Sequence, residues 1–180
     1  MSREVFILSY ARTPIGAFQG SLKNVSAPNL GSIAIKGALK KGDISPNDVK
    51  EVIMGNVLSA GIGQAPARQA SIYAGLPENI ECLTINKMCG SGLKAIMLGA
   101  QSIASGEADV VVAGGMESMS NTPYYLPKGR LGHRLGHGQV IDGIIHDGLW
   151  DVYNDKHMGN CAEMCAEKFS FSREDQDKYA

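Results

Sequence analysis

Apolar residues recur at helical intervals in three stretches of the chain, and each stretch ends at a glycine. The stretches are residues 28–41 followed by Gly42, residues 65–74 followed by Gly75, and residues 90–105 followed by Gly106. An apolar stripe with this spacing is typical of an amphipathic helix, and glycine readily adopts the conformations that end one. The pattern therefore predicts three helices with defined ends.

Short runs rich in branched and aromatic side chains precede these helices or separate them. They cover residues 4–11, 51–58, 81–86 and 109–115. Such runs favour strands, and the continuous apolar run from Val110 to Ala113 is typical of a parallel strand covered on both faces. Strands and helices that alternate along a chain indicate a layered α/β fold with a mainly parallel sheet and right-handed crossovers.

The helix predicted at residues 90–105 has apolar side chains around its whole circumference. Leu93, Ala95, Ile96 and Leu98 do not share one stripe. A helix of this kind must be buried on all sides, whereas the outer helix of an α/β sandwich keeps one face in water. A further layer of protein is therefore expected over this helix, either a second copy of the chain or a partner domain.

Beyond Ser120 the regular alternation stops. Residues 121–138 are dense in proline and glycine and show no periodicity, which indicates a functional loop or one that joins subunits. A helix is predicted at residues 159–169. Ser172, with Asp175 three residues later, is typical of the start of a final helix.

Composition and charge narrow the class of protein. The chain has 180 residues, 17 of them basic and 18 acidic, so its net charge of -1 gives no reason to expect nucleic acid or an anionic membrane as partner. Its N-terminal apolar run is too short to span a membrane. The 4 unevenly spaced cysteines do not indicate a disulfide framework. These features favour a cytoplasmic protein, and a mature mitochondrial protein would look the same.

Cys89 lies in the run NKMCGSG, between a predicted strand and the predicted helix that follows it. At the start of a helix, unpaired backbone N–H groups and the positive end of the helix dipole favour a thiolate over a thiol. Gly90 and Gly92 would leave room for a substrate to approach the sulfur, and would let backbone N–H groups point at a developing oxyanion. The run therefore predicts a nucleophilic cysteine.

Other interpretations of this region stay open from the residues alone. A lone cysteine at a strand end is often a small buried hydrophobic residue. Gly90, Gly92 and Ala95 also match a dinucleotide-binding turn, although the acidic residue expected after the next strand would be Glu117, which comes late. Glu117 could also be a catalytic acid, but a residue that closes a buried strand is more often a structural hydrogen-bond acceptor.

A zinc site is a further alternative. His157, Cys161 and Cys165 would stack on one face of a helix, with His133 and His137 upstream. A straight helix converges such side chains poorly over two turns, and most zinc sites draw their ligands from separate elements. Packing of small thiols is the preferred interpretation, and no metal is expected.

The run NKMCGSGLKAIMLGAQSIASGEADVVVAGGMESMSNTPY resembles the nucleophile segment of the thiolase family, particularly of acetyl-CoA acetyltransferases. The resemblance continues through ARTPIGAFQGSL, GQAPARQA and DGLWDVYNDKHMGNCAE, so it covers essentially the whole chain in order. Several separate motifs in register make it highly specific. One small departure lies at Lys87 and Met88, where family members vary.

The resemblance implies a thiolase-like layered α/β fold with a buried central helix between two sheets. It implies that Cys89 takes an acetyl group from acetyl-CoA and that a second acetyl-CoA attacks this group, in a reversible condensation to acetoacetyl-CoA. By match to the motifs around them, Leu149, His157 and Met158 would line the site for the acyl group and the pantetheine arm. Coenzyme A thioesters would be substrates, no cofactor is implied, and the protein would form a homodimer or homotetramer.

The chain also departs from the family in what it lacks. Thiolases have a second domain that supplies a histidine from a GHP-type motif and a second cysteine from a CxGGG-type motif, and neither motif occurs here. The expected organisation is an N-terminal thiolase core at residues 1–120 and the start of a loop region at residues 121–180, cut before the C-terminal domain. Such a chain is expected to be nearly inactive. The alternative is a non-catalytic acyl-CoA-binding or assembly module of thiolase fold.

Overall fold

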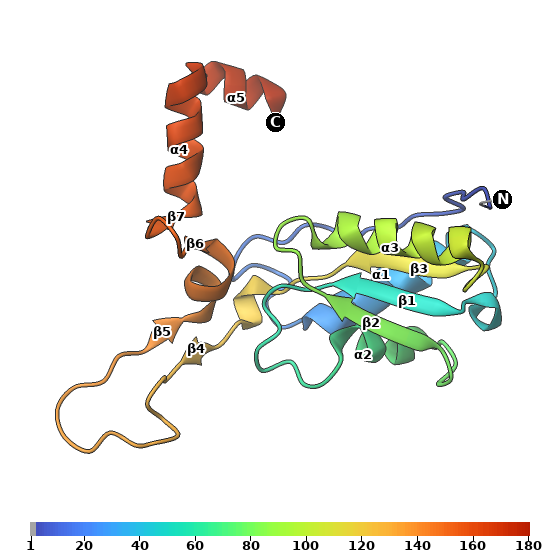
Figure 1. The fold of residues 1–180 in the computed structure, drawn as a ribbon, viewed down its shortest axis with the longest axis horizontal. Helices are drawn as coiled ribbons and strands as arrows, with labels where there is room; N and C mark the ends of the chain where they lie inside the picture. Colours follow the sequence, from blue (N-terminus) through green and yellow to red (C-terminus); the bar gives the residue numbers. More distant parts are fainter. Residues whose placement is uncertain (1–2) are drawn as a thin grey trace. The chain divides into compact units, whose positions relative to one another are not determined.

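The computed structural model describes residues 3–180 (Figure 1). It divides into two compact units, the first ending at Pro123 and the second running from Tyr124 to Ala180. No helix in the described part of the chain is both long enough and apolar enough to cross a membrane.

The first unit is built on a parallel sheet of three strands. These are β1 (Glu51–Gly55), β2 (Glu81–Ile85) and β3 (Val111–Gly115), arranged in the order β2-β1-β3. In the register of the sheet, Gly55 pairs with Ile85 on one side and with Gly115 on the other. The carboxyl ends of all three strands are therefore level, and the predicted parallel α/β fold is confirmed.

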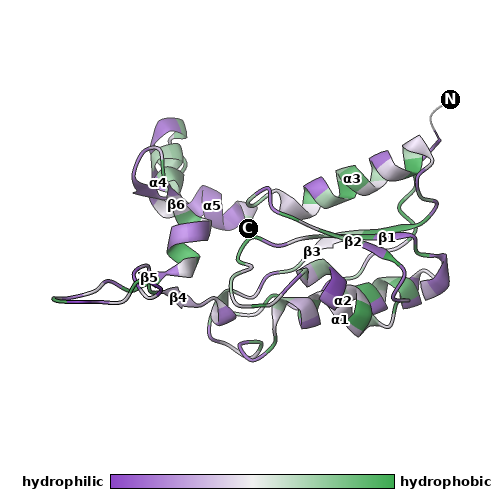
Figure 2. Ribbon diagram, turned by 60° about the horizontal axis from the view of Figure 1, so that its bottom comes forward, coloured by the Kyte–Doolittle hydropathy of each residue, from purple (hydrophilic) through white to green (hydrophobic). Residues whose placement is uncertain are grey.

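Helices cover both faces of this sheet. They are α1 (Ala27–Lys41), α2 (Pro66–Ala74) and α3 (Ser91–Ser105). Figure 2 shows α3 on one face of the sheet and α1 with α2 on the other. The hydrophobic core joins β1 to α1 and α2, and it includes the buried side chains of Val52, Met54, Ile35 and Leu39.

The three helices begin and end close to where the sequence predicts. Helix α1 starts at Ser26, whose hydroxyl accepts a hydrogen bond from the Asn29 backbone N–H. Gly75 and Gly106 end α2 and α3 in the left-handed conformation, with φ of 86° and 88°. This conformation is strained for residues with a side chain, so the two glycines fix the helix ends.

The cap of α2 was not predictable from the helix's own residues. Ala65 precedes the helix in a left-handed conformation and provides no side-chain cap. The cap comes instead from the neighbouring strand, where the Thr84 hydroxyl accepts a hydrogen bond of 2.9 Å from the Ala67 backbone N–H. Thr84 thus replaces the cap that the helix lacks in its own sequence.

Within this chain, helix α3 is covered on one side only, and the further layer of protein that the sequence predicts over it would have to come from outside these residues. Ala95 and Gly99 face the sheet and are buried. On the other side, the exposed fractions of Leu93, Ile96 and Met97 are 66%, 44% and 49%. A single sheet can cover only one face of a helix, so the apolar circumference of α3 remains half exposed.

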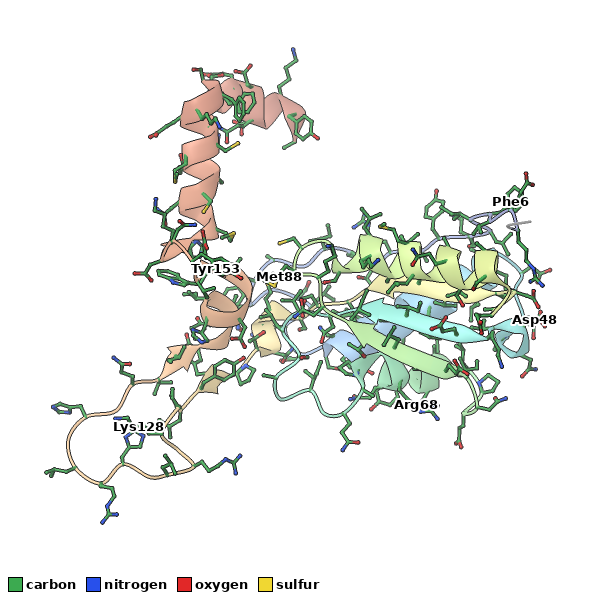
Figure 3. The ribbon with its side chains drawn as sticks, in the orientation of Figure 1. Phe6, Asp48, Arg68, Met88, Lys128 and Tyr153 are labelled. Atoms are coloured by element: carbon green, nitrogen blue, oxygen red, sulfur yellow. The ribbon has the colours of Figure 1, made fainter. Side chains whose placement is uncertain are left out.

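The strand predicted at residues 4–11 is wrong. This segment forms no strand in the structure. Its Phe6 side chain, labelled in Figure 3, is 70% exposed, and that of Ile7 is 80% exposed. It is held near its start by an ion pair between Arg3 and Asp109. Branched and aromatic residues favour a strand only where they can pack on a sheet surface, and no such packing holds these side chains here.

The second unit contains short elements. They are β4 (Tyr124–Tyr125), β5 (Ile141–Asp142), the π-helical turn η3 (Ile145–Leu149), β6 (Trp150–Asp151), β7 (Lys156–His157), α4 (Met158–Phe169) and α5 (Arg173–Tyr179). Strands β4 and β5 pair antiparallel at the base of an exposed loop that contains Lys128 (Figure 3). Residues 121–138, which the sequence predicts as a loop, lack regular elements from residue 126 onward, but Tyr124–Tyr125 form β4. The helix predicted at residues 159–169 is confirmed as α4.

The final helix, α5, starts at the predicted cap. The Ser172 hydroxyl accepts a hydrogen bond of 3.1 Å from the Asp175 backbone N–H, and the Asp175 carboxylate accepts one of 3.1 Å from the Ser172 N–H. This is a reciprocal capping box. The hydrogen bonds from Ser172 lower the pKa of Asp175, because they stabilise its charged form.

Candidate active site

Cys89 lies on the turn that connects β2 to α3. Strand β2 ends at Ile85 and helix α3 begins at Ser91, so the cysteine comes two residues before the first helical residue. Its side chain is exposed and its thiol is free. The thiol is therefore open to reagents at the carboxyl end of the sheet, and it is not the buried hydrophobic residue considered as an alternative.

Side chains on either side of Cys89 hold this turn. The Met88 backbone has a left-handed φ of 48° (Figure 3 labels Met88). The Asn86 carboxamide oxygen accepts a hydrogen bond of 2.9 Å from the Met88 N–H. The Ser91 hydroxyl donates one of 2.6 Å to the Met88 carbonyl and accepts one of 2.9 Å from the Lys87 N–H. Neither Asn86 nor Ser91 was singled out from the sequence.

The amino end of α3 is open toward the cysteine. Gly90 is the residue before the helix and has no side chain to cap it. The hydrogen-bonded amides of the turn are those of Lys87, Met88, Gly90 and Ser91, and the Cys89 amide is not among these donors. Free amides and the positive end of the helix dipole can stabilise negative charge on a sulfur or on an oxyanion next to it.

Glycines let α3 sit directly on the sheet. A Cβ atom at Gly55 would lie 2.6 Å from the Ser91 Cβ, and one at Gly92 would lie 3.7 Å from the Gly115 backbone nitrogen. Gly92 therefore faces the sheet and does not open a path to the sulfur, which corrects that part of the sequence interpretation. The close packing fixes the height of the helix start above the strand ends.

Glu117 acts as a hydrogen-bond acceptor within the fold, as preferred from the sequence. Its carboxylate accepts hydrogen bonds from the backbone N–H groups of Val57 and Leu58, at 2.9 and 3.1 Å, and from the Asn56 side chain at 2.7 Å. Burial raises the pKa of Glu117, while these three hydrogen bonds oppose the rise. Both carboxylate oxygens of Glu117 accept hydrogen bonds from N–H groups of the protein itself. The structure therefore gives no support to Glu117 as the acidic residue of a dinucleotide site.

Leu149, His157 and Met158 lie together in the second unit. Strands β6 and β7 pair antiparallel with Trp150 opposite His157, so Leu149 and Met158 flank the same end of the ribbon. The His157 Nδ1 accepts a hydrogen bond of 2.9 Å from the Gly159 N–H at the start of α4. This bond leaves Nε2 as the nitrogen that carries the proton in the neutral ring.

A hydrogen bond that could not be predicted from the sequence holds the turn just before β6. The Tyr125 hydroxyl donates to the Asp147 carboxylate and so ties β4 to the turn that ends at Leu149. The Asp147 hydrogen bond raises the pKa of Tyr125 to about 12. The two residues are far apart along the chain, and no local pattern marks them as partners.

The structure gives no support to the zinc alternative. Within residues 3–180, no group of three or more His, Cys, Asp or Glu side chains is placed to hold a metal ion. His157 faces Gly159 through its Nδ1 atom and acts as the cap of α4. This local role accounts for the position of the histidine without a metal.

Comparison with known proteins identifies the family. Residues 5–180 match the family described as thiolase, N-terminal domain. The chain is 60% identical to acetyl-CoA acetyltransferase 2 of Arabidopsis thaliana over 178 residues, which are 99% of this chain and 44% of that protein. It is 55% identical to acetyl-CoA acetyltransferase of Schizosaccharomyces pombe over 180 residues, which are 100% of this chain and 46% of that protein.

Solved structures agree with the sequence comparison. The Acat5 thiolase from Ascaris suum, crystallised in complex with coenzyme A, matches this structure with a TM-score of 0.90 at 44% identity, over 98% of this chain and 46% of that one. The chain thus spans less than half the length of the relatives that it matches. It belongs to the thiolase family and corresponds to the N-terminal domain of such proteins.

Proposed function

We propose that this chain carries the acyl-enzyme half of an acetyl-CoA acetyltransferase, with Cys89 as the residue that is acetylated. The observation that supports the proposal most is the exposed, free thiol at the uncapped amino end of α3. The similarity to acetyl-CoA acetyltransferases supports the choice of acetyl-CoA as the acyl donor. Residues 1–120 would form the N-terminal thiolase core and residues 121–180 the start of the loop region.

In the proposed first step, the Cys89 sulfur attacks the carbonyl carbon of acetyl-CoA. A new C–S bond forms, the bond between the acetyl group and coenzyme A breaks, and coenzyme A leaves as a thiolate that takes up a proton. One thioester replaces another. The carbonyl oxygen carries negative charge in between, and the Cys89 N–H and the start of α3 would stabilise it.

In the proposed second step, the enolate of another acetyl-CoA attacks the acetyl group on Cys89. Acetoacetyl-CoA forms and the cysteine is released as a thiolate. Leu149, His157 and Met158 would line the site for the acyl group and the pantetheine arm. Coenzyme A thioesters are substrates in this scheme, and the scheme needs no cofactor.

Turnover needs groups that remove the α-carbon proton and activate the sulfur. The family takes them from GHP-type and CxGGG-type motifs, and the 180 residues contain neither. We therefore infer that this chain accepts an acetyl group but produces little or no acetoacetyl-CoA. A homodimer or homotetramer is proposed for the assembled protein, because the exposed apolar side of α3 needs a further protein layer.

The compartment is proposed from the state of the cysteines. Cys82, Cys89, Cys161 and Cys165 are all free. Free thiols are expected in a reducing environment. This supports a cytoplasmic location, and the matrix of mitochondria would suit the same chemistry.

Acetylation of the purified chain tests the proposal directly. We would incubate it with acetyl-CoA and locate any acetyl group by peptide mass spectrometry, with Cys89→Ala and the exposed-cysteine control Cys165→Ala in parallel. One acetyl group on Cys89, lost in Cys89→Ala and kept in Cys165→Ala, is the expected result. Binding of coenzyme A without acetylation would instead favour a non-catalytic acyl-CoA-binding module.

A further inference from the structure

We propose that Asn86 and Ser91 form a side-chain latch that positions Cys89 by holding Met88 in its left-handed conformation. The latch rests on the proposed function, because its purpose is to present a reactive sulfur. In this role Asn86 and Ser91 are positioning residues, and they act on the cysteine through the backbone of Met88.

The left-handed conformation of Met88 needs an explanation. A residue with a side chain rarely adopts φ of 48°, because the Cβ atom crowds the backbone. Such conformations persist only where the surrounding structure holds them, and they gather at functional sites. Met88 is exposed, so packing of its own side chain does not supply this hold.

Asn86 and Ser91 hold the Met88 backbone in this conformation by hydrogen bonds to both its N–H and its carbonyl. Asn86 accepts from the N–H at 2.9 Å, and the Ser91 hydroxyl donates to the carbonyl at 2.6 Å. The Ser91 backbone N–H reaches the same carbonyl at 3.0 Å. Ser91 is itself 5% exposed and packs on Gly55, so its hydroxyl has a fixed position relative to the sheet.

The consequence falls on the next residue in the chain. Cys89 follows Met88 directly, so a change in the Met88 backbone angles rotates the Cys89 amide and its sulfur together. The latch uses the amides of Lys87 and Met88 and does not use that of Cys89. It therefore directs both the nucleophile and the amide that would face an oxyanion.

The test compares alkylation of Cys89 by iodoacetamide in the full chain, with Cys165 in the same molecule as internal reference. We expect Ser91→Ala to slow modification of Cys89 about tenfold relative to Cys165, because loss of a buried hydrogen-bond partner lets Met88 relax. Ser91→Thr keeps the hydroxyl and should stay close to wild type. Ser105→Ala is the control, since the Ser105 hydroxyl bonds the Ser102 carbonyl at the far end of α3.

A second substitution distinguishes a latch that acts through the Met88 backbone from a role of Ser91 in packing alone. Glycine adopts a left-handed conformation without strain, so Met88→Gly introduced into Ser91→Ala should restore the rate to within about threefold of wild type. Failure of this rescue in a chain that keeps its circular dichroism spectrum would overturn the proposal, as would an unchanged rate in Ser91→Ala. If Ser91→Ala does not fold, Asn86→Ala, at an exposed position, replaces it both in the alkylation assay and in the rescue by Met88→Gly.

Acetyl transfer is measured on the same variants and is judged separately. A wild-type chain that reacts with iodoacetamide but never with acetyl-CoA would disprove the proposed function, while the alkylation rates would still decide the latch. Conversely, acetylation of Cys89 at equal rates in wild type and in Ser91→Ala would leave the proposed function in place and remove the latch.

Discussion

At the scale of single residues, Glu117 shows how one carboxylate can join two strand ends. It follows β3 and accepts hydrogen bonds from the first residues after β1, at Asn56, Val57 and Leu58. Burial disfavours its charged form and raises the pKa, whereas the donors around it favour that form. The net rise means that the folded chain holds this proton more tightly than the unfolded chain does.

The sign of the resulting pH dependence follows from this rise. The contribution of Glu117 to the free energy of unfolding is fully present below its ordinary pKa of 4.5 and falls as the pH rises through the higher pKa of the folded state. Glu117→Gln should remove this pH dependence of the free energy of unfolding. It should also lower stability near neutral pH by about 1–3 kcal/mol, because an amide N–H would face the backbone donors.

Urea unfolding across a pH series measures both effects. Glu107→Gln is a matched control, because Glu107 is exposed at the end of α3 and forms no side-chain hydrogen bond with the described residues. A Glu117→Gln curve parallel to that of wild type at every pH would show that the carboxylate does not titrate with folding.

The location of Cys89 was predictable, whereas its surroundings were only partly so. A cysteine between a strand run and a helical stripe must lie at the start of the helix, and the structure places it there. The left-handed φ of Met88 could not be predicted from the sequence, because methionine normally avoids that conformation. Ser91 is recognisable as part of the turn only when the hydrogen bonds are known.

At the scale of elements, helix ends were easier to predict than strand pairing. Gly75 and Gly106 end helices through their own backbone freedom, and Ser172 begins one through its own hydroxyl. These are local effects, so the sequence reveals them. Residues 4–11 have the composition of a strand but form none, because pairing depends on a partner edge that composition does not specify.

The cap of α2 gives a prediction at this scale. The Thr84 hydroxyl bonds the Ala67 N–H, and α2 has no cap of its own. Thr84→Val keeps the shape of the side chain but removes the acceptor. We expect it to lower the free energy of unfolding by about 1 kcal/mol, the usual effect of losing a helix cap.

Denaturant unfolding of two threonine variants checks this expectation. Thr122→Val is the control, since the buried Thr122 hydroxyl has no hydrogen-bond partner in the described part of the chain. It should leave stability within about 0.5 kcal/mol of wild type or raise it slightly. Equal losses in both variants would show that the Thr84 hydroxyl contributes nothing specific to α2.

At the scale of the whole molecule, the outer side of α3 is the feature that this chain leaves incomplete. Leu93, Ile96 and Met97 are large apolar residues on one exposed helix face. Contiguous apolar surface of this kind marks contact with another protein or causes association.

Self-association through this face is therefore expected at high protein concentration. Met97→Lys would place a charge in the contact and remove about 1 kcal/mol of apolar burial, which weakens association about fivefold. Light scattering over a concentration series measures the change, and urea unfolding should show unchanged stability because Met97 is half exposed.

Ile33→Lys, at an exposed position on α1, provides the matched control and should associate as wild type does. A wild-type chain that stays monomeric, or a Met97→Lys chain that associates equally well, would show that the α3 face drives no contact.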